Sequence, residues 1–293
     1  MRALWTAVPG VLIVAFALAE VFQDLFHPTL TGSLSDYVAR TMFRLFRLRV
    51  SMLSLAGPLT IVVVIFSWAF LLSSGFALIY CASFPAGFRA FNGQQPAAGH
   101  TFWRMLFFSL QAMTTLGLGD LVPEADWLRI LVTVEALLGF ALVTASVSWI
   151  VLIYPALGRM RTLARRASIL ANTERETGIP IISGDAHVLL SDLALEVIRT
   201  RVDFIHFPML YYFHADRRRS SLAQALPYLL RLAESSSSAN GPERVRFASA
   251  MLRATLDDLA SVLADRFLRA RPTDTISVFR AYAKHHLIRI SEP

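Results

Sequence analysis

Glycine alternates with other residues in a short run near the middle of the sequence, Thr114–Asp120, which reads TTLGLGD. Gly117 and Gly119 suit a backbone whose dihedral angles are unfavourable for residues that carry a side chain. In such a backbone, carbonyl oxygens can line a path and replace the hydration shell of a cation. The hydroxyl of Thr115 can add oxygens at the inner end. The run therefore predicts a cation site built from Thr115, Leu116, Gly117, Leu118 and Gly119.

Long apolar stretches surround this run and must position it. A membrane-spanning helix needs about 20 mostly apolar residues. Stretches that meet this requirement are Val8–Phe26, Pro58–Phe84 and Trp127–Tyr154. The composition, with 55% hydrophobic and 17% charged residues, also favours a membrane protein. The first stretch ends in Glu20 and Asp24 and not in a small-residue cleavage site, so we expect a retained helix instead of a signal peptide.

A shorter helix is predicted over His100–Met113, directly before the glycine run. Together with the flanking spans, it resembles the pore module of potassium channels with one pore domain per chain. The resemblance covers about Pro58–Pro155, and Leu116 and Leu118 stand where the commonest filter has Val and Tyr. It implies an outer helix, a pore helix, a selectivity filter and an inner helix. It also implies a homotetramer, because one loop supplies only a quarter of the filter. Such a channel conducts potassium passively, with no cofactor and no catalysis.

The resemblance further identifies residues that support the filter. Phe107 and Phe108 match positions that carry tryptophans in the commonest channels, where these side chains surround the filter and hydrogen-bond its tyrosine. Here the ring of side chains around the filter, the cuff, is expected to be apolar, since neither phenylalanine can donate a hydrogen bond. Gln111 is expected to donate its amide to Asp120, with ordinary packing of the pore helix as the alternative. Because apolar packing is less directional than hydrogen bonding, we expect a preference for potassium with a deformable filter.

Two residues of the third span attract attention. An acidic residue inside a span is costly and usually functional. We expect Glu135 to be a buried hydrogen-bond partner of the pore helix and not an ion ligand. Gly139 costs about 1 kcal/mol relative to alanine within a helix. The resemblance implies a gating hinge at Gly139, and close helix packing is the alternative.

Arginine clusters predict the orientation of the chain. One cluster, between the first two spans, comprises Arg40, Arg44, Arg47 and Arg49, and the other, after the third span, comprises Arg159, Arg161, Arg165 and Arg166. By the positive-inside rule both are cytoplasmic, so the N-terminus is outside and the C-terminus inside. The net charge of +7 is almost wholly arginine, which suits a GC-rich bacterium and its inner membrane. Beside spans, such charge favours anionic lipids over nucleic acid. The expected lipid contacts are Arg40, Arg44, Arg47, Arg161, Arg165 and Arg166.

The segment Asp36–Val50 carries Arg40, Arg44 and Arg47 on one face and apolar residues mostly on another. This pattern predicts an amphipathic helix in the inner headgroup layer. In several potassium channel families a helix at this position couples the gate to the outer helix. A solvated connector is the alternative.

The whole chain is predicted to be an all-α membrane protein. The expected divisions are a transmembrane helix (1–30), an interfacial segment (31–57), the pore domain (58–155) and a helical cytoplasmic domain (156–293). Tyr154-Pro155 predicts the end of the inner helix. Later helices are predicted over Asp185–Phe204, Ser221–Ala233, Pro242–Ala270 and Asp274–Ile290. The C-terminal half has no glycine fingerprint of a nucleotide-binding Rossmann domain, no alternating strand pattern and no zinc-site spacing.

Other functions remain open from the residues alone. The apolar cuff is compatible with a weakly selective cation channel. A membrane-anchored sensor or scaffold would not conduct, and the filter glycines argue against it because such a protein does not need them. A membrane enzyme is least favoured, since no nucleophile, base and oxyanion group come together in the C-terminal half. No span carries arginine at every third position, which disfavours voltage sensing in its usual form.

Overall fold

The computed structural model of the protein describes residues 2–26, 32–48, 50–91, 94–96, 99–181, 186–214, 221–236, 242–268 and 274–288. Arg49 of the first arginine cluster lies outside these residues. The chain forms two compact units. The first comprises residues 1–38 and 61–151, and the second comprises residues 39–60 and 152–293.

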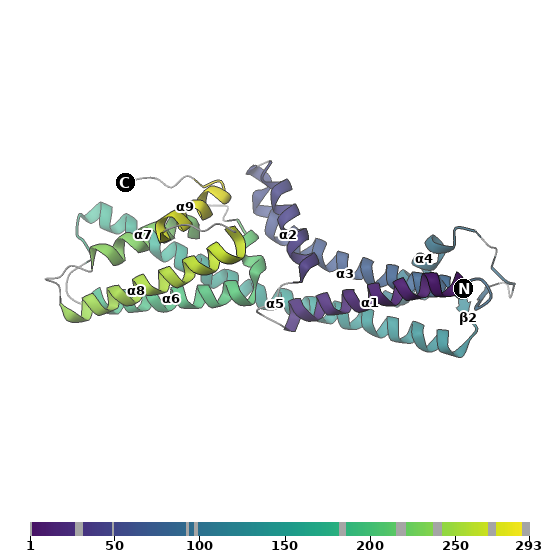
Figure 1. The fold of residues 1–293 in the computed structure, drawn as a ribbon. Coiled ribbons are helices and arrows are strands. Elements are labelled where there is room, and N and C mark those ends of the chain that lie inside the picture. The colour runs from purple at the N-terminus through teal and green to yellow at the C-terminus, as the bar shows by residue number, and fades with distance from the viewer. Residues whose placement is uncertain are drawn as a thin grey trace. The chain divides into compact units, whose positions relative to one another are not determined.

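The first unit is built from apolar helices (Figure 1). These are α1 (Arg2–Phe26), α3 (Ala56–Cys81) and the N-terminal part of α5 (Asp126–Thr177). Within the described residues, three helices are long and apolar enough to cross a membrane, and they correspond to the three predicted spans. The prediction of an all-α membrane protein is confirmed.

Close backbone contact joins α1 to α3. A Cβ atom at Gly10 would lie 2.6 Å from the carbonyl oxygen of Gly75, and one at Gly75 would lie 3.0 Å from the carbonyl oxygen of Gly10. Two glycines facing each other let the helix backbones approach, which is a common way to pack helices in lipid, where the hydrophobic effect does not drive them together.

The acidic end of α1 caps the next helix, α2 (Ser33–Phe46). Glu20 accepts hydrogen bonds from the backbone N–H groups of Ser33 and Leu34, both at 2.9 Å. Asp24 accepts one from the N–H of Gly32 at 2.8 Å. The first N–H groups of a helix have no partner inside it and carry partial positive charge. The two carboxylates therefore stabilise the start of α2 from a different element.

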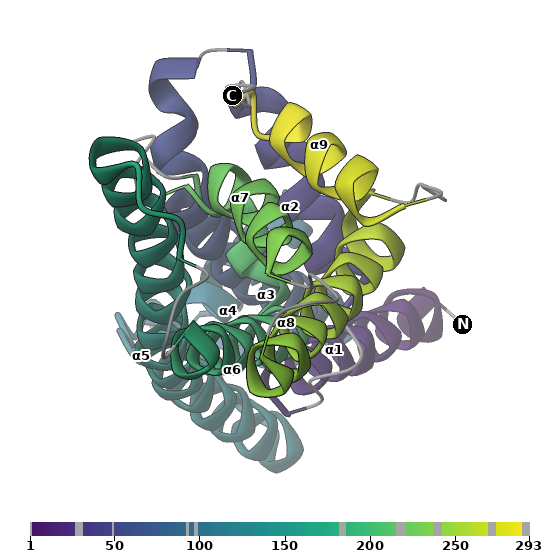
Figure 2. The ribbon, with the colours of Figure 1, turned by 90° about the vertical axis from the view of Figure 1, so that its left-hand side faces the viewer.

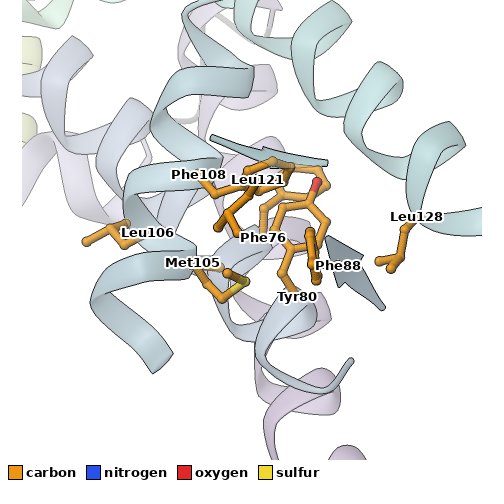
Figure 3. Close-up of a cluster of buried hydrophobic side chains, with 9 residues drawn as sticks. Phe76, Tyr80, Phe88, Met105, Leu106, Phe108, Leu121 and Leu128 are labelled. Carbon is orange, nitrogen blue, oxygen red and sulfur yellow. The ribbon is translucent and has the colours of Figure 1, made fainter. Parts of the chain in front are cut away.

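Helix α4 (Thr101–Met113), which the sequence predicted as the pore helix, follows a short hairpin strand. Strand β1 (Phe88–Ala90) pairs antiparallel with β2 (Leu121–Pro123), so the chain closes a loop around α4 and the glycine run. A buried apolar cluster anchors this loop, and Figure 3 shows Phe76, Tyr80, Phe88 and Phe108 meeting there. The rings of Tyr80 and Phe108 meet edge to face with centroids 5.4 Å apart, a favourable geometry for aromatic pairs.

The second unit contains the last turns of α2, the start of α3 and the C-terminal half. Its elements are η1 (Val50–Leu55), α6 (Ala186–His206), η2 (Pro208–Tyr212), α7 (Leu222–Ser235), α8 (Glu243–Val262), a π-helical turn (Leu263–Leu268) and α9 (Thr275–His285). The four helices predicted in this half are present as α6, α7, α8 with its π-helical turn, and α9. Figure 2 shows α7 between the C-terminal part of α5 and α9.

The end predicted for the inner helix is wrong, because Pro155 lies inside α5, which continues to Thr177. Proline removes one backbone hydrogen bond and costs about 3 kcal/mol or more inside a helix. After Pro155 the helix buries Ala156, Leu157, Leu163 and Ala164 within the second unit. Burial of this face offsets the cost of the proline, a contribution that local sequence rules do not include.

Candidate functional site

Positive φ angles alternate along the glycine run. Thr115, Gly117 and Gly119 have φ of 56°, 54° and 74°, whereas Leu116 and Leu118 do not have positive φ. This left-handed conformation costs an ordinary residue about 1–2 kcal/mol, and glycine adopts it freely. A Cβ at Gly117 or Gly119 would meet no atom within 4 Å, so their backbone angles, and not space within one chain, call for glycine. The positive φ of Thr115 was not predicted from the sequence.

The start of the run is tied to the end of α4 by backbone hydrogen bonds. The N–H of Thr115 donates to the carbonyl of Ala112 at 3.0 Å, and that of Leu116 donates to the carbonyl of Gln111 at 2.9 Å. Residues 114–120 are all exposed in the single chain, including the side chains of Leu116 (62%) and Leu118 (60%). The other end is held where the N–H of Phe91 donates to the carbonyl of Asp120 at 3.1 Å, so the run is anchored at both ends and leaves an uncovered apolar surface between them.

The two phenylalanines assigned to the apolar cuff lie apart from each other. Phe107 is half exposed, while Phe108 is buried and packs on Tyr80 and Phe88. Within one chain the two residues therefore do not surround Leu118. Phe108 instead holds α4 against α3 and β1. Phe107 and Phe108 differ in exposure because adjacent residues of a helix point to different faces.

The expected hydrogen bond between Gln111 and Asp120 is absent within the chain. Gln111 is buried, and its Nε2 has no hydrogen-bond partner in the part of the chain that the structure describes. Asp120 is exposed, and its carbonyl accepts a hydrogen bond from the N–H of Phe91.

Glu135 lies fully buried where three elements meet. On α3, the hydroxyl of Tyr80 donates to Glu135 Oε2 at 2.6 Å. On α4, the hydroxyl of Ser109 lies against Glu135 Oε1 and is also 2.9 Å from the carbonyl oxygen of Ser73. The contact expected between Glu135 and the pore helix is thus present, made through Ser109. Tyr80, Ser73 and Ser109 were not predicted as partners of Glu135. The available signal was that each is a polar residue within a mostly apolar helix.

Gly139 sits where α5 passes the end of α4. A Cβ atom there would lie 2.0 Å from the carbonyl oxygen of Met113, the last residue of the pore helix. No side chain fits at this distance, so close packing explains the glycine. This was the alternative to the gating hinge, and the hinge stays a prediction.

The arginines assigned to lipid contact differ in their surroundings. Arg44, Arg161 and Arg165 are exposed, whereas Arg40 and Arg47 are half-buried. Arg166 differs from all of them because it forms ion pairs with Asp192 and Glu196 of α6, with its NH1 2.6 Å from Glu196 Oε1. Arg166 therefore joins α5 to α6 within the second unit. This role was not predicted, because Asp192 and Glu196 are remote from Arg166 in the sequence.

Metal ligation by side chains finds no support in the described residues, which contain no cluster of three histidine, cysteine, aspartate or glutamate residues suited to an ion. The oxygens available for a cation in this site are those of the Thr115–Gly119 run. Backbone and threonine oxygens suit hard cations that lose their water shell.

Comparison with known proteins places this geometry in context. Residues 59–154 match the family described as ion channel. The chain is 28% identical over 182 residues to the uncharacterized membrane protein YdjJ of Bacillus subtilis (strain 168). That match covers 60% of this chain and 52% of the relative, so the chain spans about half the length of the relative it matches. No solved structure matches the chain. The matched range holds α4, the glycine run, Glu135 and Gly139, and it supports an ion channel: residues 59–154 are similar to the pore module of the ion channel family.

Proposed function

We propose that the chain is one subunit of a homotetrameric channel that conducts potassium passively through a filter formed by Thr115–Gly119. The alternation of positive φ at Thr115, Gly117 and Gly119 carries this proposal. Changing the sign of φ at every second residue lets successive carbonyl oxygens face the same side of the chain. Four such runs around one axis form rings of oxygens that replace the water shell of potassium.

The exposed apolar surface of the run supports assembly. A single chain supplies one run, and its leucine side chains at positions 116 and 118 are more than half exposed. Burying the exposed part of such side chains against neighbouring subunits is favourable by about 1–2 kcal/mol each. In this arrangement the N-terminus is outside, the second unit is in the cytoplasm of a bacterium, and Arg44, Arg161 and Arg165 contact anionic lipids.

Potassium flux into liposomes that hold the purified protein tests the proposal. We expect uptake that barium blocks and that Gly117→Ala abolishes, because alanine at φ of 54° is strained in all four subunits. Gly158→Ala is the matched control, since a Cβ at Gly158 meets no atom within 4 Å and the residue lies within α5. Equal loss of flux in both variants would contradict a specific role of the glycine run.

A weakly selective cation channel is the second candidate. It is favoured by Leu118 and Phe107, which carry no hydrogen-bonding group to stiffen the filter. The reversal potential with sodium on one side and potassium on the other separates the two candidates. A value near zero would favour the weakly selective channel, and a value near the potassium equilibrium potential would favour the first proposal. Assembled tetramers that pass neither sodium nor potassium would favour the non-conducting scaffold, provided that they also pass neither ion when a ligand of the second unit is added.

A further inference from the structure

A large groove lies in the second unit between α5, α7 and α9. Its volume of about 1080 Å³ is slightly above the roughly 300–1,000 Å³ typical of small-molecule sites. The floor on α5 consists of small residues one helical turn apart, Ala164, Ala167, Ser168 and Ala171. Residues at this spacing share one face of a helix. Short side chains on that face keep the space between the three helices open.

Positive charge from all three helices lines the groove. Arg175 comes from α5, Arg231 from α7, and Arg280 and Lys284 from α9. None of the four forms an ion pair with any residue that the structure describes. The carboxylate that also lines the groove, Glu234, forms an ion pair with Arg253 of α8. A second carboxylate, that of Glu174, lies beside the groove and accepts a hydrogen bond from the hydroxyl of Tyr228 at 3.2 Å. Four cations against these two carboxylates, one of which is already paired with Arg253, leave the groove with excess positive charge.

The rest of the lining suits an organic group. Tyr228 is buried, and the guanidinium of Arg231 lies 5.8 Å from the centre of its ring. Pro227 and Ile276 add apolar surface beside the alanines of α5. Arginine forks match the geometry of phosphate oxygens. Charge at the rim and an apolar floor are the two features that a small organic phosphate requires.

We propose that this groove binds an organic phosphate of nucleotide size that carries at least two anionic groups. The cations lie on three different helices, so a ligand that pairs with all of them needs more than one anionic group. The shared chemistry, phosphate attached to an organic body, could be supplied by a soluble nucleotide or by a phospholipid headgroup. The experiment below separates these sources.

Such a ligand would regulate the channel, and this part of the inference rests on the proposed function. The helix that forms the floor of the groove, α5, is the same continuous helix that carries Glu135 and Gly139. A ligand that binds one arrangement of α5, α7 and α9 better than another shifts the equilibrium toward the arrangement that it binds better. Ligand binding is therefore expected to change the open fraction of the pore.

Binding is measured on the full-length protein in nanodiscs, with no ion flux required. The soluble probe is ATP, added to nanodiscs of phosphatidylcholine, and the lipid probe is cardiolipin, whose headgroup carries two phosphates, at increasing content. We expect saturable ATP binding that the double variant Arg280→Gln/Lys284→Gln weakens at least tenfold. Added salt should weaken it as well, because exposed charges are screened.

A matched control removes the same two charges elsewhere. Arg244 and Arg246 are exposed on α8 and do not line the groove, so the variant Arg244→Gln/Arg246→Gln should bind as the parent does. Ala171→Leu keeps every charge and fills part of the floor. It should weaken binding of ATP while the protein keeps its thermal unfolding temperature, which separates loss of the groove from loss of the fold.

Each outcome bears on the inference. Binding of ATP that the groove variants weaken supports a soluble ligand, and binding of cardiolipin that the same variants weaken supports a lipid headgroup. Binding that Arg244→Gln/Arg246→Gln weakens equally, or no binding of either probe, would overturn the site. If the protein conducts ions but binds neither probe, the ligand site is contradicted and the channel function is not. If the protein binds a probe but conducts no ions, the ligand site is supported and the proposed channel function is contradicted.

Discussion

Gly139 and Gly158 lie on the same helix but in different surroundings, which allows the explanation for Gly139 to be tested. A Cβ at Gly139 would collide with the backbone of Met113, whereas a Cβ at Gly158 would meet nothing within 4 Å. We expect Gly139→Ala to lower the free energy of unfolding by about 1–3 kcal/mol through overpacking. Gly158→Ala should be neutral or stabilising by up to about 1 kcal/mol.

Thermal unfolding of the purified protein in detergent measures both changes. If Gly139 acts only as a hinge, alanine should stabilise the helix at both positions, because a straight helix prefers alanine. Equal stabilisation in the two variants would therefore contradict close packing and favour the hinge.

The hydrogen bonds of Glu135 make a second prediction. Glu135→Leu removes the acceptor of the Tyr80 hydroxyl, while the hydroxyl of Ser109 can still donate to the carbonyl of Ser73. A buried hydroxyl without a partner costs about 1–3 kcal/mol. We expect Glu135→Leu to be destabilising by this amount, and Tyr80→Phe to recover part of the loss when the two changes are combined.

The double-mutant cycle gives the interaction energy directly. Glu135→Gln is the conservative control, since its amide oxygen can still accept one hydrogen bond. If the effects of Glu135→Leu and Tyr80→Phe simply add, and Glu135→Gln leaves both assembly and conductance unchanged, Glu135 does not support the pore helix.

Helix α2 has a role that its amphipathic pattern only partly indicated. Phe43 is fully buried, and its ring lies 5.5 Å from that of Tyr212, 5.1 Å from that of His285 and 5.2 Å from that of His286. These partners belong to η2 and to the end of α9, within the second unit. The apolar face of α2 is thus covered at Phe43 by protein, whereas the sequence predicted contact with the headgroup layer.

Replacing this ring tests how strongly α2 is held. Phe43→Ala should lower the free energy of unfolding by about 3–5 kcal/mol, because it leaves a cavity among the rings of Tyr211, Tyr212, His285 and His286. Leu45→Ala on the same helix is the matched control, since Leu45 is 56% exposed. Unfolding by urea, followed by circular dichroism, measures the difference. Similar values for the two variants would show that α2 is held by the membrane and not by this cluster.

The histidines of this cluster predict a pH dependence for the whole chain. Burial, with help from the nearby Arg47 and Arg44, lowers the pKa of His285 to about 4. Burial, with help from His285, His214 and Arg47, also lowers the pKa of His286 well below its usual value. Tyr211 and Tyr282 complete the surroundings, and burial raises the pKa of each, so both stay neutral. The folded protein therefore holds these histidines neutral.

Stability should fall as the solution becomes more acidic. The unfolded chain binds protons at a histidine pKa of about 6.5 and the folded chain does not, so the contribution is complete above that pH and is lost toward pH 4. We expect the unfolding temperature to fall between pH 7.5 and 5.5, where most carboxylates do not yet titrate. His286→Phe keeps a ring against Tyr282 and should make the fall smaller. An unchanged pH profile in this variant would contradict the assignment.

Local patterns were sufficient for most of the helices. Apolar stretches of membrane-spanning length marked α1, α3 and α5, because the thickness of the bilayer sets their length. Helical spacing marked the helices of the C-terminal half. The alternation of Gly117 and Gly119 predicted a backbone with unusual dihedral angles, and both residues have positive φ.

Contacts between distant residues depend on packing, which local patterns do not encode. The sequence contained Glu20, Glu135 and Arg166, but their partners lie 13 to 55 residues away, and nothing local assigns them. The continuation of α5 through Pro155 and the groove above its alanines likewise arise from helices that pack beside it. Side-chain type and spacing therefore determined which chemistry the chain carries, whereas the three-dimensional arrangement decided which groups meet, because burial energy depends on neighbours that are remote in sequence.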